Sequence, residues 1–138
     1  MNSYQSKYNL LPGSSYDEVV KYARKEFNTI RKLTKRQPYV RSKYFHGDKI
    51  FVTIFWDHLM QKHQKERRIR LKFYAAAIDL LRNNTTDPVS IIEDTNKTAF
   101  HRFFGITKDG VEFCVQVKHD LRTGRKDFMS VFARRSKK

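Results

Sequence analysis

His101 and Lys118 are the two side chains whose types and positions first suggest chemistry. Asp109-Gly110 lies between two stretches rich in β-forming residues and is typical of a two-residue hairpin turn. If these two residues alone form the loop, His101 lies directly opposite Lys118. Cβ atoms of opposed residues lie roughly 4.5 to 5.5 Å apart. The sequence thus predicts an imidazole beside an ammonium, flanked by Phe103, on the face of the hairpin away from the helices.

Such a pair has the groups that RNA cleavage needs without a metal ion. The reaction needs a base for the ribose 2′-OH, an acid for the leaving oxygen and cations for the charged intermediate. The candidate catalytic residues are His101, Lys118, Ser130, Arg102 and His58. A second interpretation stays open, in which Arg102 and His101 only close the edge of the core and Lys118 is a solvated strand residue. A slip of one residue in register would flip the arrangement, and the face that Ser130 occupies is not fixed.

The charge of the chain points to an anionic partner. Its 29 Lys and Arg face 14 Asp and Glu, which gives a formal net charge of +15. A polyanion relieves the repulsion within such a domain, so nucleic acid is the first candidate, ahead of an anionic membrane surface or an acidic protein. The candidate nucleic-acid-binding residues are Arg67, Arg68, Arg70, Lys72, Phe103, Arg122, Arg125 and Lys126.

Several kinds of site are not expected. The single cysteine, Cys114, excludes an internal disulfide and is interpreted as strand packing. His58 and His63 are five residues apart, a poor spacing for zinc on one helical face, and we expect neither metal nor cofactor. The sequence has no glycine-rich phosphate loop. It also has no apolar run of about 18 residues and no signal-peptide pattern near its start, so we expect a cytoplasmic protein without a membrane contact.

Apolar spacing predicts helices followed by strands. Ser14 or Ser15 can cap a first helix that ends before Pro38. We expect a buried strand over 50–56 and a long helix from Asp57 to Asn83. Strands over 98–107, 111–118 and 127–133 form a three-strand meander. The domain organisation is a flexible arm at 1–13, one α+β domain at 14–134 and a basic tail at 135–138.

Two groups of motifs carry a resemblance to known proteins. The motifs are Phe55-Trp56-Asp57-His58-Leu59 before a basic helix, then Lys108-Asp109-Gly110, and Gly124 to Phe132 with its Phe-Met-Ser-Val-Phe ending. From about Tyr39 to Ala133 the chain resembles the small phage and mobile-element nuclease-like domains of the barnase, EndoU, colicin and RelE superfamily. The resemblance implies an α+β fold, with N-terminal helices packed on one face of a small curved antiparallel β-sheet that ends in a three-strand meander.

The same resemblance implies a function. Such domains bind RNA on the sheet face away from the helices and cut it without metal, leaving a 2′,3′-cyclic phosphate and a 5′-hydroxyl. Carried over by position, the active groups are Lys118 and Ser130, supported by His58, Arg102 and Arg125. No glutamate stands out as a base. The prediction is a toxin-like or mobile-element endoribonuclease, with RNA and an acidic antitoxin or immunity protein as partners. Two alternatives are a non-catalytic nucleic-acid-binding module and an adaptor for an acidic protein.

Overall fold

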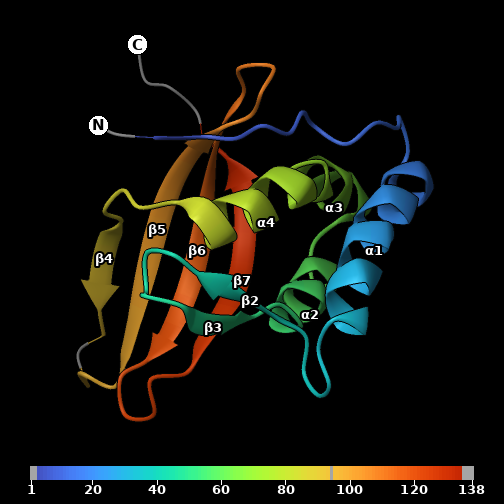
Figure 1. Ribbon diagram of the computed structural model, residues 1–138. Helices are drawn as coiled ribbons and strands as arrows, with labels where there is room; N and C mark the ends of the chain where they lie inside the picture. The colour runs from blue at the N-terminus through green and yellow to red at the C-terminus, as the bar shows by residue number, and fades with distance from the viewer. Residues whose placement is uncertain (1–2, 94, 135–138) are drawn as a thin grey trace.

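A computed structural model describes residues 3–93 and 95–134, and it has helices packed against one face of a curled β-sheet (Figure 1). Along these residues the elements are β1 (Tyr4–Gln5), α1 (Tyr16–Lys32), β2 (Tyr39–Ser42), β3 (Asp48–Phe51), α2 (Ile54–Met60), α3 (Gln64–Leu71), α4 (Tyr74–Asn83), β4 (Val89–Ile92), β5 (Thr98–Ile106), β6 (Glu112–Asp120) and β7 (Lys126–Ala133). The predicted α+β class is confirmed. In the described part of the chain, no helix has the length and apolar character needed to cross a bilayer.

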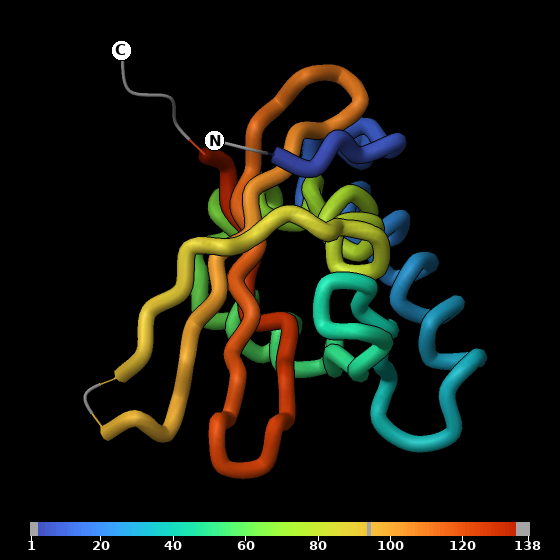
Figure 2. The backbone as a smooth tube through the Cα atoms, turned by 60° about the vertical axis from the view of Figure 1, so that its left-hand side comes forward, coloured from blue at the N-terminus to red at the C-terminus, as the bar shows by residue number. Residues whose placement is uncertain are grey.

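The sheet is mixed, whereas the expectation was an antiparallel one. Its strand order is β1-β5-β6-β7-β3-β2, and β4 also pairs with β5. The meander β5-β6-β7 is antiparallel as predicted, but β1 runs parallel to β5 and β3 runs parallel to β7. In Figure 2, β4 is the outermost strand beside β5, and the β2-β3 hairpin curls toward the opposite side of the meander. The sheet therefore forms a half-barrel around the core.

The predicted helix after Ser15 is confirmed. The Ser15 side chain accepts a hydrogen bond from the backbone N–H of Glu18, which satisfies one free donor of the first turn. Buried residues recur along α1 at helical spacing, at Val19, Ala23, Phe27 and Ile30. The apolar stripe of α1 therefore lies in the core.

The strand predicted over 50–56 ends early, at Phe51, and the chain enters α2 instead. Phe55, Trp56 and Leu59 are spaced for one helical face, and all three are buried. Packing explains the change, because the Phe55 ring stacks on Phe128 of β7 with centroids 4.6 Å apart. The long helix predicted from Asp57 to Asn83 is likewise divided into α2, α3 and α4.

The segment predicted as a flexible arm, 1–13, instead contributes β1 to the sheet. The reason is the carboxylate of Asp79, which is buried in α4 and needs hydrogen-bond donors. Tyr4 Oη donates to Asp79 Oδ1 over 2.9 Å, and Ser6 Oγ donates to Oδ2 over 2.8 Å. The predicted basic tail, 135–138, lies outside the described residues.

Gly105 marks the closest approach of β5 to the helix layer. A Cβ at this position would lie 2.6 Å from Cζ of Phe113 and 2.9 Å from Cδ1 of Leu80. Both neighbours are buried and have little room to move. We expect Gly105→Ala to lower the free energy of unfolding by about 1–3 kcal/mol, as overpacked cores do. Urea denaturation measures it, and an unchanged midpoint would contradict the contact.

Candidate active site

The β5-β6 hairpin differs from the predicted register by one residue. Its loop has three residues rather than two, since Thr107 pairs with Val111 through an N–H···O bond of 2.9 Å. A two-residue type I′ turn needs positive φ at both central positions. Gly110 has a φ of 89°, but Asp109 is not among the described residues with positive φ. The loop is therefore a type I turn followed by a left-handed glycine.

The shift separates His101 from Lys118, so the predicted pair is wrong. His101 lies opposite Val117, and Lys118 lies between Phe100 and Asp127. We call the face that carries Val117 and meets the helices the inner face, and the other the outer face. His101 lies on the inner face and Lys118 on the outer face.

A different partner for His101 is His119, one residue beyond Lys118. Nε2 of His101 and Nδ1 of His119 are 3.0 Å apart, within hydrogen-bond distance. Nδ1 of His101 is 2.6 Å from Oγ of Ser90, on the neighbouring strand β4. Among the described residues, Nε2 of His119 has no hydrogen-bond partner. Ser90, His101 and His119 thus form a chain of hydrogen bonds that ends at an unoccupied nitrogen.

The turn between β2 and β3, rather than a helix, covers these hydrogen-bonded side chains. The ring of Phe45 lies 5.4 Å from the ring of His101 and 6.0 Å from that of His119. Lys126 Nζ lies 4.9 Å from the Phe45 ring and donates to Oδ2 of Asp48 over 2.9 Å. His101 and His119 remain half-buried, while Ser90 is exposed. Because the pair is only half-buried, it lies within reach of a ligand.

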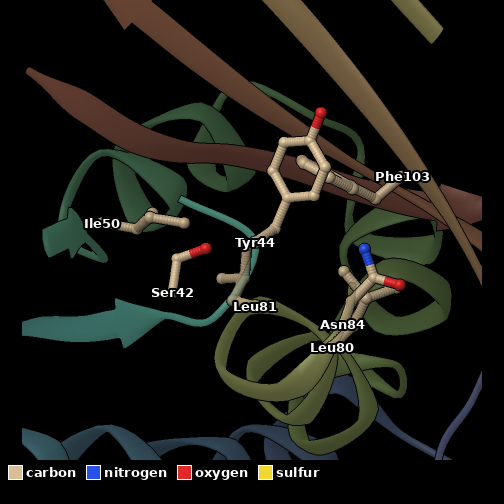
Figure 3. Close-up of a pocket in the computed structure, with 7 residues that line it drawn as sticks. All are labelled: Ser42, Tyr44, Ile50, Leu80, Leu81, Asn84 and Phe103. Carbon is tan, nitrogen blue, oxygen red and sulfur yellow. The ribbon is translucent and has the colours of Figure 1, made fainter. Parts of the chain in front are cut away.

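A small cluster of side chains holds the turn in place, as Figure 3 shows. The ring of Tyr44 contacts Phe103 edge-on at 5.3 Å, and Tyr44 Oη donates to Oδ1 of Asp87 over 3.3 Å. Leu80 of α4 and Asn84, which directly follows this helix, close the other side. The cavity between them has no room for a water molecule. The turn that covers the histidines is therefore packed against both the sheet and a helix.

The surroundings lower the pKa of both histidines, which favours the neutral imidazole. Burial lowers the pKa of His101, and the nearby charges of His119 and Lys126 lower it further. Burial also lowers the pKa of His119, followed by the charge of Lys126. The pKa of Asp48 is lowered by its hydrogen bond from Lys126, then by the charge of that lysine, and to a smaller extent by His46 and His119. A neutral imidazole can accept a proton, so the pair is prepared to act as a base.

These lowered pKa values predict acid sensitivity. Below the ordinary histidine pKa of about 6.5, the unfolded chain binds protons more readily than the folded pair does. The free energy of unfolding therefore falls as the pH is lowered. Carboxylates with lowered pKa values, Asp48 and Asp120, act in the same direction but below their ordinary value near 3.8. Between pH 6.5 and 5, we expect the double variant His101→Gln and His119→Gln to lose less free energy of unfolding than the wild type. Urea denaturation at several pH values measures it, and equal slopes would contradict the burial of the pair.

Of the other predicted catalytic residues, Arg102 and Ser130 lie on the outer face on either side of Gln116, and His58 of α2 lies near Ser130. Gln116 lies between Arg102 and Ser130 across three strands, and Arg102 Nε donates to Gln116 Oε1 over 3.1 Å. His58 from α2 and Ser130 line one narrow cavity together with Arg70. The structure therefore brings Ser130, Arg102 and His58 into one neighbourhood but places His101 on the opposite face.

Two of the predicted nucleic-acid contacts have side chains that are buried in the structure. Phe103 is 3% exposed, since the corrected register turns it into the core. Lys126 is 5% exposed and bonded to Asp48. Lys126 therefore lies opposite His119 in the sheet, and it is not an exposed cation that could contact a ligand.

The remaining predicted nucleic-acid contacts keep part of their surface, but most are occupied. Arg67 donates to the backbone oxygens of Lys62 and Met60, and Arg68 to that of Ser14. Other members of the set are paired or half-buried: Arg70 with Glu66, Arg122 with Asp120, Arg125 with Asp127, and Lys72 at the end of α3. The run of cations in α3 is therefore partly structural.

Sequence reasoning missed His119 and Ser90. One signal could have found His119, since Lys108-Asp109-Gly110 also fits a three-residue loop with glycine in the left-handed position. With that loop, His101 and His119 share a face. No comparable signal marks Ser90, because β4 is a short edge strand whose apolar residues, Val89 and Ile91, are about half exposed.

Comparisons of the chain with protein-family models, with curated proteins and with solved structures found no match. Among the described residues, no group of three or more His, Cys, Asp or Glu side chains is arranged to hold a metal ion. Cys114 is buried, and burial raises the pKa of its thiol to about 11, which leaves little thiolate for reaction.

Proposed function

We propose that this chain is a metal-independent endoribonuclease whose proton-transfer group is the hydrogen-bonded chain of Ser90, His101 and His119. The observation that carries the proposal is Nε2 of His119, which has no hydrogen-bond partner within the described part of the structure and lies at the end of these hydrogen-bonded side chains in a half-buried site. Imidazole is the commonest general base because its pKa lies near neutral pH. The resemblance of the sequence to metal-free RNA-cutting domains supports the same reaction.

The arrangement allows two neutral proton distributions. If His101 Nδ1–H donates to Ser90 and His119 Nδ1–H donates to His101, then His119 Nε2 presents a lone pair. If Ser90 donates to His101 and His101 donates to His119, then His119 Nε2 carries a hydrogen. The first distribution makes His119 a base and gives Ser90 the role of a positioning residue.

In the reaction, the 2′-OH gives its proton to Nε2 of His119 while the 2′-oxygen attacks phosphorus. The bond from phosphorus to the 5′-oxygen then breaks, which leaves a 2′,3′-cyclic phosphate, and the leaving oxygen takes a proton. Attacking and leaving oxygens lie on opposite sides of the phosphorus, so a second group supplies that proton. We assign this role to His46, which directly follows Phe45 in the turn between β2 and β3, because the Phe45 ring lies against both histidines.

The reaction also requires cations that stabilise the negative charge of the intermediate. Lys126 lies opposite His119 on the neighbouring strand β7 and adds positive potential where the dianionic intermediate would form. The formal net charge of +15 attracts RNA from a distance. Lys118 and Ser130, the active groups that the resemblance implies, lie on the outer face, and in this proposal they contact RNA outside the reacting phosphate.

A second candidate function is RNA binding without cleavage, and it is supported by the outer face. The guanidinium groups of Arg70 and Arg102 both lie over the ring of Phe132, with carbon-to-centroid distances of 5.6 and 5.8 Å. Arg134 lies over Phe104 at 4.4 Å. Aromatic rings among arginines favour single-stranded nucleic acid, whose bases stack on such surfaces.

One experiment separates the two functions. Purified protein is incubated in EDTA with end-labelled single-stranded RNA, and in parallel with the same strand carrying 2′-deoxy sugars. Cleavage of the RNA alone supports the endoribonuclease, because the 2′-OH is the nucleophile. Intact RNA that is nonetheless retarded on a gel would overturn cleavage in favour of the binding module. RNA that is neither cut nor retarded at low salt would contradict both.

A further inference from the structure

A second hollow lies on the outer face, where the α1-β2 loop approaches β3 and the start of β7. Its volume is about 670 Å³, which falls within the range of small-molecule sites. In Figure 1 the α1-β2 loop and the β6-β7 loop point in the same direction from the body of the molecule. Arg125 Nη2 donates to Oε1 of Gln37 over 2.6 Å and so joins these two loops across the hollow.

One wall of this hollow is aromatic and apolar. Tyr39 and Phe51 are paired across β2 and β3, with ring centroids 6.1 Å apart at an angle of 70°. Leu33 also borders the hollow, with 76% of its surface exposed. A flat apolar ligand would cover all three side chains.

Most of the rest of the lining is basic. Lys35, Arg36, Lys49 and Arg125 border the hollow together with the neutral Thr34 and Gln37, and none of the described lining residues is acidic. Arg125 is paired with Asp127, but no salt bridge within the described residues occupies the other three. Lys49 Nζ lies over the Tyr39 ring, 4.6 Å from its centroid, and the guanidinium carbon of Arg125 lies over the Phe51 ring at 4.2 Å, so a cation contacts each ring of the wall. An anionic group next to a flat ring would therefore satisfy both halves of the lining.

We propose that this hollow is a nucleotide-binding pocket, with the base against Tyr39 and Phe51 and the phosphate among Arg36, Lys35 and Lys49. Bases stack on aromatic side chains regardless of sequence, and cations bind phosphate. The volume is too large for a phosphate alone, and the cations would not suit a neutral aromatic molecule. The pocket lies on the face opposite His101 and His119, and the proposal does not depend on RNA cleavage.

The nucleotide can come from a free mononucleotide or from a single strand, and the test separates these sources. Calorimetric titrations use adenosine 5′-monophosphate, adenosine, inorganic phosphate and a short oligodeoxyadenylate, which lacks the 2′-OH and cannot be cut by its attack. We expect the monophosphate to bind more tightly than adenosine or phosphate alone. If only the oligonucleotide binds through the pocket, the source is a strand.

Variants assign the binding to the pocket. Arg36→Ala removes an exposed loop cation, and we expect it to weaken binding about tenfold, as loss of a charged phosphate contact does. Tyr39→Leu removes the stacking ring and weakens binding by a similar factor. Lys32→Ala, which removes one exposed cation from the last turn of α1, is the charge-matched control and leaves binding within about twofold.

The proposal is overturned if the monophosphate and the oligonucleotide both fail to bind at low salt. It is also overturned if Arg36→Ala and Tyr39→Leu, checked for folding by circular dichroism, bind as tightly as the Lys32→Ala control. Neither result depends on cleavage, so the pocket and the endoribonuclease can fail separately.

Discussion

His119→Ala should slow RNA cleavage by a factor on the order of 10² to 10⁴, the usual contribution of a general base. The substitution removes the only imidazole nitrogen of the pair that has no partner in the described structure, and leaves His101 bonded to Ser90 alone. Single-turnover cleavage of a labelled RNA measures the loss. Because the pKa of His119 is lowered, the wild-type cleavage rate should rise with pH and reach its plateau below pH 6.5.

The matched control is His63→Ala. His63 is exposed at the start of α3, where its side chain caps nothing. Its loss should leave the cleavage rate unchanged, whereas Ser90→Ala should give an intermediate loss because Ser90 only orients His101. Equal rates in His119→Ala and His63→Ala would remove the histidine pair from the chemistry.

Phe128→Ala should lower the free energy of unfolding by about 3–5 kcal/mol, the usual cost of emptying a buried phenylalanine site. Phe128 is fully buried, stacks on Phe55 at an angle of 8°, and lies 6.2 Å from the ring of Tyr74. It is the point where β7 meets α2 and α4. Urea denaturation measures the loss.

Two further variants keep this prediction testable. A loss of 3–5 kcal/mol is a large part of the stability of a typical domain, so Phe128→Ala can unfold the protein outright. Phe128→Leu should then show a smaller loss, below about 1.5 kcal/mol. Phe132→Ala, on the outer face and half-buried, should cost less than Phe128→Ala. Equal losses at 128 and 132 would contradict the assignment of inner and outer faces.

Much of the fold could be predicted from the sequence. Helix α1 has both a capping serine and a helical stripe, and each strand of the meander is bounded by turn residues. The segment after Phe51 could not be assigned, because β-branched and aromatic residues suit a buried strand and a buried helix equally well. Only the packing of Phe55 on Phe128 decides between them.

The site was harder to predict, and one loop residue explains why. The side chains of a strand alternate between faces, so a loop of three residues instead of two exchanges the partners of every residue in the hairpin. A two-residue loop predicts Lys118 as the partner of His101, whereas the three-residue loop brings His101 to His119. Ser90 and Phe45 reach the pair from β4 and from the β2-β3 turn, and such long-range contacts leave no local pattern.

The most direct test of the proposed function is the chemical structure of the cleavage products. Wild-type protein and His119→Ala are incubated with single-stranded RNA in EDTA, and the ends of the fragments are identified by mass spectrometry. Attack by the 2′-oxygen predicts 2′,3′-cyclic phosphate and 5′-hydroxyl ends that form with the wild type and are lost with the variant. Fragments with 5′-phosphate ends, or equal yields from both proteins, would contradict catalysis by the His101–His119 pair.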